Sequence, residues 1–182
     1  LRSRGLWLMF FYVFCTYGAI TYYLFRLPVL LVDNGFDVAS VGLVLSILWL
    51  SFSISSTLLR NLVDAPSVRV ILLGAPVLIA LGYLMAFYCS NVLCLVLASF
   101  LVGCGLACSN APSTQLVLEL APKGMTAISA SMDITFARLG GVATVGLLAN
   151  SVFGYSVVAI TILSLVALAC AWLVVQGPGK EI

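Results

Sequence analysis

The chain has 182 residues, of which 63% are hydrophobic and 8% are charged, and its formal net charge is +2. Soluble domains carry about 25% charged residues, so this composition, with a mean hydropathy of +1.23, excludes a soluble globular protein and indicates an integral membrane protein. The apolar runs recur along the whole length, which excludes a single N-terminal secretory signal as their source.

Six apolar segments are each long enough to cross about 30 Å of hydrocarbon as a helix that rises about 1.5 Å per residue. The expected spans are residues 6–31, 38–59, 68–87, 92–118, 125–150 and 155–175. The short breaks between them contain turn residues such as Asp33-Asn34-Gly35, so neighbouring helices must be antiparallel. The sequence therefore predicts an all-α integral membrane protein, with residues 1–182 forming one domain of six transmembrane helices.

Basic residues indicate the orientation of these helices. Six of the eight fall on one predicted side of the membrane, namely Arg2, Arg4, Arg60, Arg69, Lys123 and Lys180. The positive-inside rule then predicts that both termini are cytoplasmic. The membrane itself, plasma membrane or intracellular vesicle, is left open.

The first span carries several tyrosines and one charge in its outer half. Tyr22 is a candidate for a solute cavity, although tyrosines near a membrane interface also serve as anchors in the headgroup region. Arg26 is a second candidate, and the alternative is that its side chain reaches the interface from about five residues inside the membrane. After the second span, Asp64 between Arg60 and Arg69 predicts either a charge latch at a cytoplasmic gate or a solvated turn.

The fourth span combines small residues with one amide. Gly103, Gly105 and Ala107 are residue types that let helices approach closely in lipid. Asn110 follows, beside Pro112, which removes one helical hydrogen bond. Asn110 is therefore a candidate to bond either a neighbouring helix or a solute.

The fifth span holds two full charges, Asp133 and Arg138, at a depth where each costs roughly 2.5–3.5 kcal/mol to insert. At about 100° per residue, the two lie about 140° apart around the helix, so they are not stacked as an i, i+4 pair. Each is expected to need a partner on another helix or in water. Two interpretations stay open here: charges paired inside a helix bundle, and charges that line a solute or ion path.

One motif resembles a known family. Glu119-Leu120-x-Pro122, followed by Phe136-x-Arg138-Leu139-Gly140, resembles the junction of the tenth and eleventh helices in the sugar and organic-ion branches of the major facilitator superfamily, most closely the synaptic vesicle glycoprotein and its insect relatives. The loop at 60–69 resembles a degenerate form of the motif that joins the second and third helices of each half. The chain departs from the first pattern at Thr126, where the family has Arg, and at Ala137, where it has Gly.

The resemblance implies that the six spans are the C-terminal half of a twelve-helix transporter that works by alternating access. The first, second, fourth and fifth spans would then lie near the cavity and the third and sixth would support them from outside. Asp133 and Arg138 would be cavity or inter-helix charges. Glu119 and Lys123 would belong to the cytoplasmic gate.

The predicted function is transport of a small organic or sugar-like solute, and the alternative is a facilitator-like scaffold that binds protein partners without transporting. The chain has no histidine, which excludes Ser-His catalysis and the usual zinc ligands, so we predict neither an enzyme nor a bound cofactor or metal. The expected partners are lipid, a solute, and a missing N-terminal six-helix half or a second copy, because the chain opens at Leu1. We expect no nucleic-acid partner.

Overall fold

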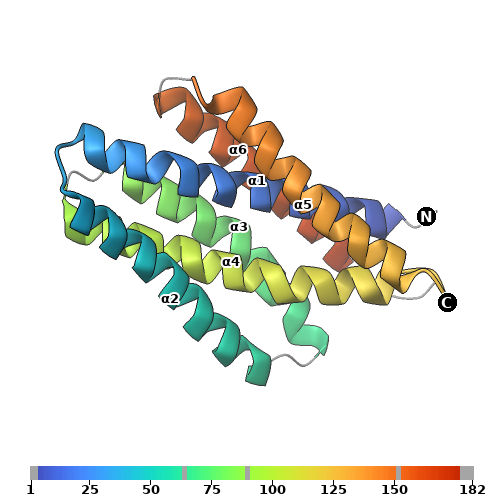
Figure 1. Cartoon of the computed structure of the whole chain (residues 1–182). Coiled ribbons are helices and arrows are strands. Elements are labelled where there is room, and N and C mark those ends of the chain that lie inside the picture. Colours follow the sequence, from blue (N-terminus) through green and yellow to red (C-terminus); the bar gives the residue numbers. More distant parts are fainter. Residues whose placement is uncertain (1–3, 63–64, 89–90, 151–152, 177–182) are drawn as a thin grey trace.

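The computed structural model describes residues 4–62, 65–88, 91–150 and 153–176, and there the chain consists of six helices (Figure 1). Their bounds are α1 Arg4–Asp33, α2 Val38–Leu62, α3 Ala65–Tyr88, α4 Val92–Leu120, α5 Thr126–Leu148 and α6 Phe153–Gln176. The predicted all-helical class with six helices is confirmed.

Five of the described helices are long and apolar enough to cross a membrane. α5 is not among them, because Asp133, Arg138 and several hydroxyl residues make it the least hydrophobic of the six. The chain is therefore a multi-pass membrane protein in which one helix is more polar than the rest. A polar helix at membrane depth must be covered by protein or water.

α1 and α4 form the centre of the bundle and contact each other directly. α5 and α6 pack against α1, α2 and α3 pack against α4, and α3 also packs against α6. α2 and α5 lie on opposite sides of the α1 and α4 pair (Figure 1) and share no substantial contact within the described residues. The surface of α1 and α4 between α2 and α5, which we call the open face, is thus covered by none of the described helices.

Tyrosines tie the helices together inside the bundle. Tyr12 donates to the Leu72 carbonyl at 3.2 Å, Tyr83 donates to the Ala19 carbonyl at 2.9 Å, and the Tyr23 hydroxyl lies 2.9 Å from the Ser99 hydroxyl. Each ring is at most 2% exposed, so each buries its apolar body while its hydroxyl is satisfied. Burial inside the protein, and not anchoring at the interface, is the role of these three side chains.

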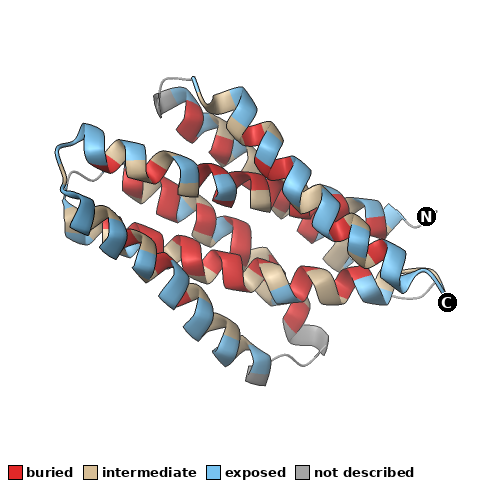
Figure 2. Cartoon of the chain, in the orientation of Figure 1, coloured by how far each residue is buried: buried red, intermediate tan, exposed pale blue. Residues whose placement is uncertain are grey.

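Small residues bring two helix pairs into backbone contact. A Cβ at Gly140 would collide with the Phe14 carbonyl of α1, and a Cβ at Gly103 would collide with the Leu48 carbonyl of α2. Gly141 and Thr144 are also buried against α1. Figure 2 shows that buried positions gather along α1 and α4 in the middle of the bundle. The second half of α5 therefore uses its small residues to pack closely on α1.

Candidate functional site

Four side chains from three helices form two hydrogen-bonded pairs beside the open face. The Tyr17 hydroxyl of α1 donates to the Asn110 Oδ1 of α4 at 2.7 Å. One turn further along α4, the Thr114 hydroxyl donates to the Asp133 Oδ2 of α5 at 3.2 Å. We call Tyr17, Asn110, Thr114 and Asp133 the polar cluster.

Asp133 has an incompletely satisfied carboxylate. The residue is only 6% exposed, and its Oδ1 is buried without a hydrogen-bond partner among the described residues. A buried carboxylate is costly unless each oxygen finds a hydrogen bond or a counter-charge. Oδ1 is therefore a group that a proton, a cation or a solute donor would stabilise.

Arg138 lies near the middle of α5 (Thr126–Leu148) and its side chain is exposed. In the described part of the chain it forms no ion pair or hydrogen bond, with Asp133 or with any other residue. The expected partner for Asp133 is thus a hydroxyl on α4, while no described residue supplies a partner for Arg138.

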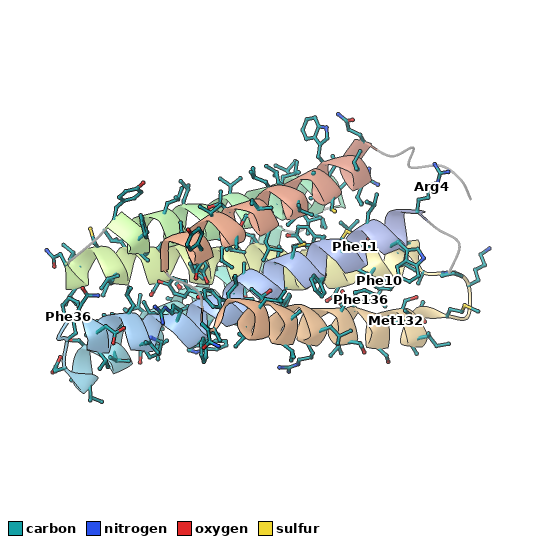
Figure 3. All side chains as sticks on the ribbon, turned by 90° about the horizontal axis from the view of Figure 1, so that it is seen from above. Arg4, Phe10, Phe11, Phe36, Met132 and Phe136 are labelled. Atoms are coloured by element: carbon teal, nitrogen blue, oxygen red, sulfur yellow. The ribbon has the colours of Figure 1, made fainter. Side chains whose placement is uncertain are left out.

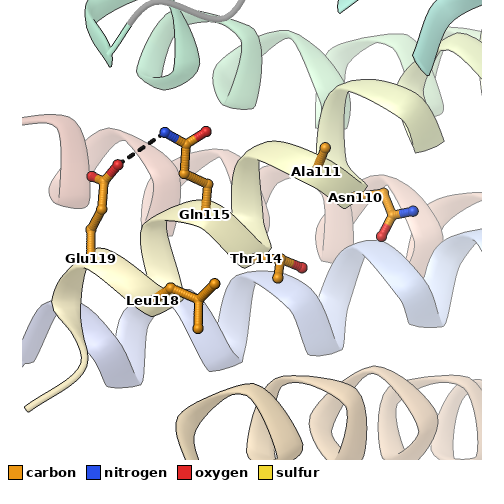
Figure 4. Close-up of a pocket in the computed structure, with 6 residues that line it drawn as sticks. All are labelled: Asn110, Ala111, Thr114, Gln115, Leu118 and Glu119. Atoms are coloured by element: carbon orange, nitrogen blue, oxygen red, sulfur yellow. Dashed lines mark hydrogen bonds between the residues drawn. The ribbon is translucent and has the colours of Figure 1, made fainter. Parts of the chain in front are cut away.

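A groove runs along α4 next to the polar cluster (Figure 4). Its volume is about 660 Å³, within the roughly 300–1,000 Å³ that small-molecule sites occupy. The residues that line it all come from α4 and are Asn110, Ala111, Thr114, Gln115, Leu118 and Glu119. Four of these residues are polar and two are apolar, so the wall offers hydrogen bonds as well as apolar contact to a small solute.

Two other predicted cavity residues lie elsewhere. The Tyr22 hydroxyl is 2.7 Å from the Ser156 hydroxyl of α6 and donates to the Leu148 carbonyl at 3.2 Å, which ties α1 to the neighbouring ends of α5 and α6. Arg26 lies one turn beyond Tyr22 and lines a small void with Tyr23 and Tyr83. Neither residue joins the polar cluster.

A family model of the Major Facilitator Superfamily matches residues 1–145. The chain belongs to the Major Facilitator Superfamily. Members of this superfamily are typically transporters and not enzymes, so the protein is a membrane transporter in its general class, and its six helices correspond to half of a facilitator bundle. A search of curated protein sequences finds no significant match.

The predicted gate residues of this facilitator lie near the ends of its helices. Arg60 and Lys123 are exposed, and Arg69 is half-buried near the start of α3. Glu119 accepts a hydrogen bond from Gln115 Nε2 at 3.0 Å (Figure 4) and has no basic partner among the described residues. Asp64, the centre of the predicted latch, lies outside the described residues.

The sequence did not single out Tyr17, Thr114 or Gln115 as site residues of this facilitator. A signal for two of them was available, since Thr114 follows Asn110 by four residues and Gln115 precedes Glu119 by four, which places each pair on one face of a helix. Tyr17 offered no such signal, because its partner is on a helix 93 residues away in the chain.

Proposed function

We propose that this chain is the C-terminal half of a secondary carrier that moves a small organic or sugar-like solute by alternating access. The proposed branch is that of the synaptic vesicle glycoprotein and the organic-ion and sugar transporters. Its support is the superfamily match together with the Glu119-Leu120-x-Pro122 and Phe136-x-Arg138-Leu139-Gly140 pattern. The other half would be an N-terminal set of six helices or a second copy of this chain.

The observation that carries the proposal is the polar content of α4 and α5. α4 lines a groove of small-molecule size, and α5 holds a buried carboxylate, one oxygen of which has no partner among the described residues, and an exposed guanidinium at mid-helix. Facing lipid, the Arg138 charge alone would cost roughly 2.5–3.5 kcal/mol. A water-filled cavity between two six-helix halves removes that cost, because water and the second half both supply polar partners.

Within this carrier, Asp133, Arg138 and Asn110 are the proposed solute-contacting residues. Arg26 would lie further along the cavity wall, toward the outer end of α1, and the buried Tyr22 would support that wall through its hydrogen bonds to α5 and α6. The proposed cytoplasmic gate consists of Arg60, Asp64, Arg69, Glu119 and Lys123, and both termini would be cytoplasmic, since the basic residues concentrate on that side.

Solute flux tests the site. Membrane vesicles from cells that express the complete gene product would be assayed with labelled hexoses, organic cations and organic anions. We expect Asp133→Asn and Thr114→Val each to lower uptake of the transported probe by about 10- to 100-fold, because a hydrogen bond to a charged group contributes about 1.5–3 kcal/mol. Thr135→Val is the matched control, since the Thr135 hydroxyl is exposed and bonds only to the Ser131 carbonyl of its own helix.

Wild-type uptake in both site variants would contradict the assignment of the polar cluster. Uptake of none of the probes by the wild-type protein, under either a proton or a sodium gradient, would favour the scaffold alternative. Quantifying each variant in the vesicles by immunoblot separates loss of transport from loss of protein.

A further inference from the structure

A second groove lies between α3 and α6, which run side by side in the view of Figure 3. Its volume is about 700 Å³ and all of its lining residues are apolar. They include Leu73, Gly74 and Val77 from α3 and Leu165, Ala169 and Trp172 from α6. The groove is made by other helices than the open face and therefore serves another purpose than the proposed solute site.

The groove is an unfilled recess in the lipid-facing surface. A Cβ at Gly74 would meet no atom within 4 Å, and Leu165 and Trp172 are more than half exposed. Protein interiors leave few voids of this size, so a bilayer-facing recess must be filled by something from the bilayer. Hydrocarbon chains are the most abundant group at that depth.

Two polar residues, Arg69 and Gln176, lie at one end of the groove. Arg69 precedes Leu73 by four residues on α3, and Gln176 follows Trp172 by four residues on α6, so each lies about one turn beyond the apolar lining. Because the groove pairs the start of α3 with the end of α6, Arg69 and Gln176 share that end. Arg69 is half-buried and has no hydrogen-bond or ion-pair partner in the part of the chain that the structure describes.

We propose that this groove binds an anionic phospholipid from the surrounding bilayer. The phosphate of the lipid would pair with the Arg69 guanidinium and accept from the Gln176 amide, while one acyl chain fills the groove past Gly74. A single cation above an apolar slot matches the chemistry of an anionic headgroup above an acyl chain. In the proposed orientation this end faces the cytoplasmic leaflet, where anionic lipids concentrate.

Lipid retention tests this assignment. The complete gene product would be placed in nanodiscs of equal phosphatidylglycerol and phosphatidylcholine, extracted, and analysed for co-purifying lipid by native mass spectrometry. We expect about fivefold more phosphatidylglycerol than phosphatidylcholine on the wild-type protein. Arg69→Gln should abolish that preference. Gly74→Leu should remove the retained lipid, because its side chain would occupy the groove that Gly74 lines, where a Cβ meets no atom within 4 Å.

Matched controls are Arg4→Gln, which removes an exposed charge at the start of α1, and Gly42→Leu, which adds a side chain to a helical glycine with equally open surroundings. Both should behave like the wild-type protein. Equal retention of the two lipids by the wild-type protein, or an unchanged preference in Arg69→Gln, would overturn the proposal. So would a wild-type dimer that Gly74→Leu dissociates, because a second copy would then fill the groove.

Discussion

Gly140 and Gly146 have opposite surroundings although both belong to α5. The Gly140 position touches the Phe14 carbonyl of α1, whereas a Cβ at Gly146 would meet no atom within 4 Å. Small residues at a helix contact allow close packing in lipid, where the hydrophobic effect does not drive helices together. The closeness of α1 and α5 thus depends on single positions and not on the average composition of the helix.

Replacing Gly140 by Ala should destabilise the protein by about 1–3 kcal/mol, the usual cost of overpacking, because a backbone carbonyl cannot move aside as a side chain can. Gly146→Ala should be neutral or stabilising by up to about 1 kcal/mol, since Ala restricts the unfolded chain. Thermal unfolding of both variants in the same detergent measures the contrast. Equal melting temperatures for the two variants would argue against the close α1–α5 contact.

Asp133 illustrates how a residue's neighbours decide its chemistry. The pattern of the sequence established that this carboxylate needs a partner outside its own helix, and the structure supplies the Thr114 hydroxyl for one oxygen. The other oxygen stays buried without a partner among the described residues. The second oxygen is what makes Asp133 a better candidate for solute contact than a carboxylate whose bonds are complete.

Asp37 caps the N-terminus of helix α2. Asp37 immediately precedes α2, and its Oδ1 accepts from both the amide and the hydroxyl of Ser40. This is the N-cap arrangement, which satisfies an amide that lacks an intrahelical acceptor. The two hydrogen bonds from Ser40, the one from the hydroxyl first, lower the pKa of the Asp37 carboxyl.

Asp37→Ala should lower the melting temperature at neutral pH, because α2 loses its cap. Since folding lowers the pKa of Asp37, the carboxylate's stabilisation is complete above its ordinary value of 3.8 and is lost as the pH falls through the lowered value in the folded protein. The difference between wild type and variant should therefore shrink below about pH 4. Melting curves in detergent over a pH series provide the measurement.

Two further variants serve as controls for the pH series. Asp37→Asn keeps a capping oxygen without the charge, so it should melt near the wild type and lack the pH dependence. Asp33→Ala removes an exposed acid at the end of α1, where a negative charge opposes the helix dipole, and should not destabilise the protein. A loss in Asp33→Ala as large as in Asp37→Ala would contradict the cap.

At the scale of the whole molecule, the six helices leave one polar surface uncovered. α1 and α4 meet in the centre, α3 and α6 lie behind them, and α2 and α5 flank the open face (Figure 1). Arg138 is exposed near the middle of α5. An assembly in which a second half covers this side chain would surround its charge with protein or water in place of lipid.

This arrangement predicts opposite effects of one substitution in two settings. Arg138→Leu should stabilise the six-helix chain when it is produced alone, because it removes an uncovered charge that costs roughly 2.5–3.5 kcal/mol in lipid. In the complete gene product the same change should lower solute uptake. Thermal unfolding of the isolated chain and vesicle flux of the complete protein give the two readouts, with Arg4→Leu at the start of α1 as the control.

A destabilised isolated chain would show that Arg138 already has favourable contacts within the six helices. Unchanged flux in the complete protein would show that the guanidinium takes no part in transport. Either result would contradict the proposal that Arg138 lines the solute cavity.

The class of the protein, the presence of six helices and the need to shield Asp133 and Arg138 followed from the sequence by itself, because bilayer thickness dictates helix length and hydropathy is additive along the chain. The small residues Gly103, Gly105 and Ala107 were likewise readable as helix-packing positions, whereas the contact of Gly140 with α1 was found only in the structure. These properties depend on each helix separately.

The tertiary structure alone decided which polar groups meet. Tyr17 finds Asn110 and Asp133 finds Thr114, while Tyr22 is bonded to Ser156 and Arg138 is left exposed. Such contacts depend on the rotation of each helix about its axis and on its neighbours, and both are set by packing between segments far apart in the chain. A helical pattern specifies which residues share a face, but the residues opposite that face belong to other helices.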